Sequence, residues 1–100
     1  MNWLIVLRPA RVGMLTEGAT AAESAAVARH FAYLERLAAE GKVGLAGRTT
    51  EDDDRTIGLV LLSASSEEEA REIMSNDPAV VQGVMRAELH PFRVAVKKGA

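Results

Sequence analysis

The chain has 100 residues, of which 48% are hydrophobic, 12 are basic, 14 are acidic and none is cysteine. This length fits a single domain spanning residues 1–100, and the lack of cysteine excludes disulfides, thiol nucleophiles and cysteine-based metal sites. A net charge of −2 with interspersed signs gives no basic stripe for nucleic acid. The apolar run Trp3–Leu7 is too short for a signal or membrane segment. We therefore expect a soluble, cytoplasmic protein that binds neither nucleic acid nor membranes.

The N-terminal part predicts a strand followed by a long helix. Trp3–Leu7 is apolar on both faces of a strand, and residues 10–18 predict a loop. Thr20 and Glu23 have the spacing of a capping box, which predicts a helix running to about Glu40. On a helical wheel the predicted helix has an apolar stripe centred on Val27, Phe31, Leu34 and Ala38, with His30 and Leu37 on its flank.

The remaining sequence predicts three more strands and a second helix. Val43–Gly47 and Ile57–Leu62 are the next two strands, joined by a solvated connection that carries four acidic residues. Ser65 and Ser66 precede Glu67-Glu68-Glu69, which favours a helix start and a helix ending near Asn76. Asp77-Pro78 then predicts a short extra turn through Val81, and Val84–Val96 predicts a last strand containing Pro91.

The predicted order βαββαβ is that of a ferredoxin-like α+β sandwich. In the usual strand order of this fold the first and third strands are central, and these are the two strands that are apolar on both faces. Because two helices cover only one side of such a sheet, the other side needs a partner. We expect two copies to pair through their sheet faces into a dimeric α+β barrel.

Two residues stand out for chemistry. His30 lies on the predicted long helix, and Asp77 lies at the start of the short extra turn. A histidine held by an aspartate can act as a general base near neutral pH. The simpler alternatives are a histidine that packs on the helix flank and an aspartate that only caps a helix.

Other candidate sites have weaker signals. Arg8 and Arg11 follow the first strand and could bind an anionic ligand, or could be solvated loop arginines. The acidic run Glu51–Asp54 lacks the spacing of a calcium loop, so we expect a solvated turn and no metal site. The sequence contains no GxGxxG, Walker or GxSxG motif, so we expect no cofactor.

An ordered set of motifs resembles the YCII-related (YciI-like) family of dimeric α+β barrels. The matching segments are Leu7-Arg8-Pro9 with Arg11, His30 to Leu37, Glu40-Gly41-Lys42, Leu45-Ala46-Gly47, Ser66 to Ala70, Asp77 to Val80, Gly83-Val84 and Glu88 to Phe92. The resemblance covers nearly the whole chain. One departure is the segment Gly47-Arg48-Thr49, where many family members carry proline after the glycine.

The resemblance implies a small homodimer with a cleft in each protomer, where His30 and Asp77 would form a catalytic dyad. One characterised activity in the family is dehydrochlorination of a chlorinated hydroxyhydroquinone, while most members have no established reaction. Three hypotheses follow for this chain. The first is a cofactor-independent enzyme of lyase or isomerase type acting on a small cyclic or aromatic substrate. The second is a non-enzymatic protein that binds a small ligand in the same cleft. The third is a structural dimeric partner of another protein, which would need a second exposed apolar patch for which the sequence offers no clear candidate.

Overall fold

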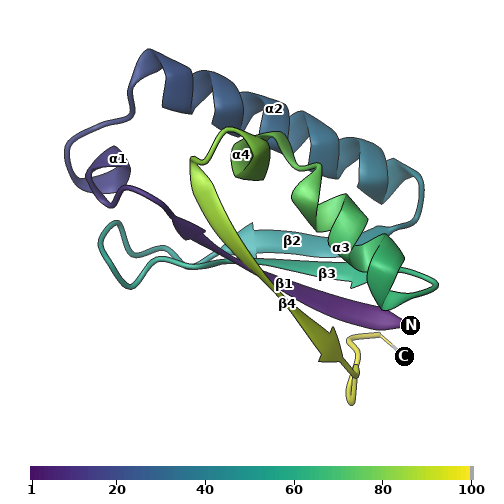
Figure 1. Cartoon of the computed structure of the whole chain (residues 1–100). Coiled ribbons are helices and arrows are strands. Elements are labelled where there is room, and N and C mark those ends of the chain that lie inside the picture. The colour runs from purple at the N-terminus through teal and green to yellow at the C-terminus, as the bar shows by residue number, and fades with distance from the viewer. Residues whose placement is uncertain (100) are drawn as a thin grey trace.

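The computed structural model describes residues 1–99 and contains one antiparallel sheet with its helices on one face (Figure 1). The strands are β1 (Asn2–Pro9), β2 (Val43–Arg48), β3 (Gly58–Ser63) and β4 (Met85–Phe92). The helices are α1 (Gly13–Thr16), α2 (Ala21–Ala39), α3 (Glu67–Ser75) and α4 (Pro78–Val81). The strand order is β2-β3-β1-β4. The chain therefore has the predicted ferredoxin-like α+β fold, with β1 and β3 in the centre of the sheet.

Strand alternation places the core between the sheet and the helices. Trp3, Ile5 and Leu7 of β1 are buried, while the residues between them are only half-buried. Val60 and Leu62 of β3 are almost completely enclosed and complete the centre of the core. The other face of the sheet carries no helix (Figure 1). Within residues 1–99 no helix combines the length and apolarity that crossing a membrane requires.

Side-chain caps start the two helices and the short extra turn that the sequence predicts. The Thr20 hydroxyl accepts the Glu23 amide at 3.1 Å, and Glu23 in return accepts the Thr20 amide at 2.8 Å, which is a complete capping box. Ser66 caps α3 by accepting the Glu69 amide. Asp77 caps α4, and Pro78 takes the first helical position.

Two predicted boundaries are wrong. Residues 10–18 contain the single-turn helix α1, whose N-cap is Val12 with no side-chain cap, so the sequence carries no capping signal for it. The last strand ends at Phe92 and not at Val96. Phe92 pairs with Asn2, the first residue of β1, so the chain beyond Phe92 has no neighbouring strand to pair with. Val96 is accordingly 91% exposed.

Candidate active site

His30 lies in the middle of α2, on the side of the helix that faces the core. It is only 4% exposed, and Ala26, Leu34 and Leu37 are the other buried residues of the helix. These positions repeat every three or four residues, which places them on one side of a helix. The predicted centre of the buried stripe was therefore wrong, because it included Phe31, which is 54% exposed. His30, expected on the flank, lies in the buried stripe itself.

Asp77 contacts the Nδ1 side of the His30 ring, although 47 positions separate the two residues in the chain. Its Oδ2 lies 2.6 Å from Nδ1 of His30, and its Oδ1 accepts the Ala79 amide at 2.9 Å. Asp77 is 4% exposed, so both contacts are shielded from water. An ionised carboxylate only accepts hydrogen bonds, so Nδ1 carries the proton in this arrangement. The same side chain thus caps α4 and orients the imidazole.

The second ring nitrogen of His30, Nε2, is not bound by Asp77. Among residues 1–99, Nε2 has no hydrogen-bond partner. Nε2 is also accessible from outside the protein. Within residues 1–99, the only side-chain nitrogen or oxygen that is both fully buried and without a hydrogen-bond partner is Nε1 of Trp3. In a neutral imidazole protonated at Nδ1, Nε2 carries the lone pair and accepts a proton. This is the state that a general base requires.

His30 lines a cleft of ≈ 790 Å³ between α2 and the β2 end of the sheet. This volume lies within the range of small-molecule sites. Asp77 does not line the cleft; it borders a separate gap of ≈ 10 Å³ in the core, which is too small for a ligand larger than water. Phe31 lines the cleft next to His30, and the two ring centroids are 5.2 Å apart. Phe31 therefore forms part of the wall of the cleft.

The sheet side of the cleft is open because the helices cover β2 only at its first residue, Val43. Ala46 of β2 pairs with Val60, which pairs with Ile5, so these three side chains lie in one row on the helix side of the sheet. Val60 and Ile5 are buried, whereas Ala46 is exposed. In the next row Gly58 stands between Arg48 and Leu7 and adds no side chain. Ala46 and Gly58 therefore form a flat floor opposite His30 and Phe31.

The two predicted ligand-binding arginines occupy different places. Arg8 lines the cleft, and its Nε lies 3.4 Å from Glu88 in a pair whose side chains are half-exposed. Arg11 is not among the residues that line the cleft. Its guanidinium binds both carboxylate oxygens of Glu23 and the carbonyl of Gly18. Ligand binding by Arg8 and Arg11 stays a prediction.

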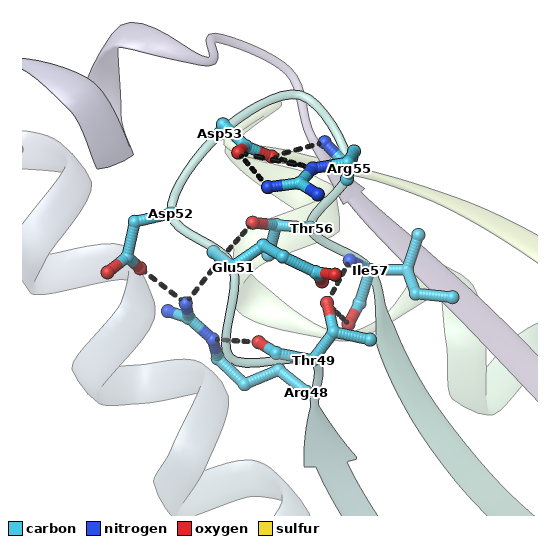
Figure 2. A network of polar contacts seen from close by, with 8 residues as sticks. All are labelled: Arg48, Thr49, Glu51, Asp52, Asp53, Arg55, Thr56 and Ile57. Atoms are coloured by element: carbon cyan, nitrogen blue, oxygen red, sulfur yellow. Dashed lines mark hydrogen bonds and ion pairs between the residues drawn. The ribbon is translucent and has the colours of Figure 1, made fainter.

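The end of β2 and the loop that follows it border the cleft, and Arg48, the last residue of β2, was not selected as a site residue from the sequence. Arg48 donates from Nε to the carbonyl of Thr49, and from Nη2 to the carbonyl of Glu51 and to Asp52 (Figure 2). Arg48 and Thr56 line the cleft. The only signal in the sequence was that Arg48 lies in the segment Gly47-Arg48-Thr49, where the chain departs from the family pattern. That signal did not specify a role for Arg48.

The acidic residues of this loop form a solvated turn. Asp53 pairs with Arg55 through three side-chain contacts, and Asp52 pairs with Arg48 (Figure 2). The Arg55 guanidinium lowers the pKa of Asp53 to about 2. Within residues 1–99, no group of three or more histidine and carboxylate side chains is placed to hold a metal ion.

Comparison with known proteins identifies the family of the chain and supports its fold. The model of the YCII-related domain matches residues 1–93, so the chain belongs to the YCII-related family. A solved structure of 5-chloro-2-hydroxyhydroquinone dehydrochlorinase from Burkholderia phenoliruptrix AC1100, in complex with 2,5-dihydroxybenzoquinone, is similar to this chain. The TM-score is 0.69 and the sequence identity 27%, over 93% of this chain and 94% of that one. No curated protein sequence matches the chain.

Proposed function

We propose that the chain is a small enzyme of lyase or isomerase type, in which His30 acts as a general base on a cyclic or aromatic substrate. The observation that carries the proposal is the buried 2.6 Å contact between Asp77 and Nδ1 of His30, with Nε2 left without a protein partner beside a ligand-sized cleft. The similarity to a dehydrochlorinase of a hydroxyhydroquinone supports this class of reaction. The chemistry needs no cofactor.

The proposed mechanism is a proton transfer through Nε2. His30 takes a proton from a ring carbon or hydroxyl of the substrate, and the imidazolium that forms is stabilised by the carboxylate of Asp77. In a dehydrochlorination the electron pair left by the proton forms a double bond while chloride leaves with the C–Cl pair. In an isomerisation His30 returns the proton to a different atom. Asp77 stays ionised and keeps the ring in the tautomer that presents a lone pair.

The test measures turnover in wild type, His30→Gln and the control Arg29→Gln, which changes the neighbouring exposed residue outside the cleft. The substrates are 5-chloro-2-hydroxyhydroquinone, followed by chloride release, and a panel of small phenols and lactones, followed by deuterium uptake from D₂O. We expect turnover of at least one compound, a loss of about 10²–10⁴-fold in His30→Gln and little change in Arg29→Gln. Turnover that survives His30→Gln would rule out this mechanism. Binding without turnover, tolerant of His30→Gln, would favour the ligand-binding alternative.

The functional unit in this proposal is a homodimer that pairs through the uncovered face of the sheet. Leu4 pairs with Leu61, which pairs with Leu45, so three leucines form a row on that face. Leu59 adds a further side chain that is 38% exposed, and Leu45 is 69% exposed. The accessible surface is 6377 Å², whereas roughly 5,500 Å² is expected for a compact monomer of this mass. A second copy on this face would bury the apolar row.

We also propose that the protein is cytoplasmic. The absence of cysteine is compatible with the reducing conditions of the cytoplasm.

A further inference from the structure

We propose that Arg48 determines ligand specificity by binding an oxyanion substituent, such as a carboxylate, on a ring held in the His30 cleft. This inference rests on the proposed use of the cleft and adds the class of ligand that it takes. It starts from the position of Arg48 on β2. Arg48 lies in the row that continues through Gly58 and Leu7, on the helix side of the sheet, and it lines the same cleft as His30.

The guanidinium of Arg48 is fixed in place with one nitrogen unused. Nε and Nη2 are held by two backbone carbonyls and by Asp52, whereas Nη1 has no hydrogen-bond partner among residues 1–99. A guanidinium held in this way loses little further conformational freedom when it binds a ligand. Figure 2 shows the guanidinium beside its own loop, next to Asp52 and the Glu51 carbonyl. Arg48 is therefore a preformed donor.

The charges around the cleft favour an anion at this end. Its charged lining residues are Arg8, Glu35 and Arg48. None of the four acidic residues at 51–54 lines the cleft. Glu35 belongs to the C-terminal half of α2, which leads into the first residues of β2, while Arg48 is the last residue of that strand (Figure 1). The length of β2 is about 16 Å, and Glu35 lies four helical residues, about 6 Å, back from the end of α2, so about 10 Å separates the two charges along the cleft. A ring with one charged substituent would thus be oriented with that group at Arg48 and away from Glu35.

The floor of the cleft sets the shape of the rest of the ligand. Ala46 and Gly58 leave the sheet flat, and Phe31 offers an exposed aromatic face on the opposite wall. A planar ring fits between an aromatic side chain and a flat backbone surface. The ligand class is therefore a planar ring compound with a carboxylate or similar oxyanion, in contact with Phe31 and within the cleft that His30 lines.

The experiment compares 2,5-dihydroxybenzoate with hydroquinone, two rings that carry the same pair of hydroxyl groups and differ by a carboxylate. Binding is measured by calorimetry and by NMR shifts of Phe31 and His30, with wild type, Arg48→Gln, Asp52→Asn and Arg55→Gln. We expect wild type to prefer 2,5-dihydroxybenzoate by about tenfold, and Arg48→Gln to lose this preference while hydroquinone binding is kept. Arg55→Gln, which changes the same loop outside the cleft, should keep the preference.

Asp52→Asn keeps the test informative if Arg48→Gln disturbs the loop. It retains Arg48 and removes the carboxylate that competes for its guanidinium, so the preference for 2,5-dihydroxybenzoate should rise. An equal preference in wild type and Arg48→Gln, or no rise in Asp52→Asn, would overturn the role of Arg48. If both rings shift Phe31 and His30 equally, the Arg48 inference alone fails. If neither ring shifts them, the proposed function of the cleft fails as well.

Discussion

Single carboxylates hold together several parts of this molecule, and each uses its two oxygens differently. Asp77 gives one oxygen to the amide of Ala79 and the other to His30. Glu23 binds the guanidinium of Arg11 with both oxygens while one of them also accepts the Thr20 amide. The first residue connects α4 to α2, and the second connects the segment after β1 to the start of α2. Loss of either charge should therefore affect more than one element.

The Glu23 pair predicts a dependence of stability on pH. The hydrogen bond from Arg11, followed by the Thr20 amide, lowers the pKa of Glu23 from 4.5 to about 2. A carboxyl whose pKa is lowered on folding stabilises the native state above its unfolded pKa, and this contribution disappears as the pH falls through the folded pKa. Glu23→Gln should therefore lower the free energy of unfolding at pH 7. The difference in this free energy between wild type and Glu23→Gln should shrink as the pH falls from 4.5 to 2. Urea titrations across this range measure it.

Glu17→Gln is the matched control for this prediction. Glu17 is 3.8 Å from Arg11 and its side chain is 77% exposed, so its contact should contribute little. A difference for Glu23→Gln that stays constant from pH 7 to pH 2 would contradict the assignment.

At the scale of elements, α2 is fixed to the C-terminal half of the chain at two points. One is the His30–Asp77 contact, and the other is the hydroxyl of Tyr33, which donates to the carbonyl of Ile73 in α3 at 2.7 Å. Tyr33 follows His30 by three residues and Ile73 precedes Asp77 by four, so the two contacts are about one helical turn apart. Burial, and then the charge of Asp77, raise the pKa of Tyr33, which keeps its hydroxyl protonated as a donor.

Tyr33→Phe tests the second point. It removes the hydroxyl and leaves the Ile73 carbonyl without this donor, so the free energy of unfolding should fall by about 1 kcal/mol. Hydrogen exchange should also increase at the start of α4, because the segment carrying Asp77 is held less firmly. Thermal or urea unfolding with amide exchange measures both effects. Unchanged exchange at Ala79 would show that the Asp77 segment does not depend on Tyr33.

The elements were predictable where the signal is local. Two helix starts are predicted by signals within four residues, namely Thr20 with Glu23 and Asp77 with Pro78. Both caps are present in the structure. The central strands were predictable because β1 and β3 are apolar on both faces. The exposure of Phe31 and Ala46 was not predictable, since it depends on how far α2 lies from β2. The contact between His30 and Asp77 was a hypothesis from the family resemblance, because 47 positions separate them. Arg48 was not identified as a binding residue because its loop partners are fixed only in the folded chain.

At the scale of the whole molecule, one face of the sheet is covered and the other is not. The described chain measures 40 × 24 × 21 Å, and its uncovered face carries a row of leucines across three strands. Leu61 is central in this row, between Leu4 and Leu45. A stable interface buries roughly 800 Å² per partner. The proposed dimer therefore requires most of this face.

Leu61→Lys tests the dimer by placing a charge in the middle of the leucine row. We expect wild type to sediment as a dimer and Leu61→Lys as a monomer, because an unpaired ammonium at an apolar interface is costly. Val81→Lys is the control, since Val81 is 62% exposed on α4 and away from the sheet face. A monomeric wild type at micromolar concentration, or a dimeric Leu61→Lys, would contradict the proposed assembly.

The central claim is that Asp77 holds His30 in the tautomer that presents Nε2 to the cleft. Two-dimensional ¹H–¹⁵N NMR of the His30 ring, recorded in alkaline solution for wild type and Asp77→Asn, tests it most directly. The account predicts a proton on Nδ1 in wild type. In Asp77→Asn the asparagine amide can donate to Nδ1, so the proton should move to Nε2 and turnover should fall. A wild-type ring protonated at Nε2, or the same tautomer in both proteins, would contradict the claim and leave Asp77 as a helix cap.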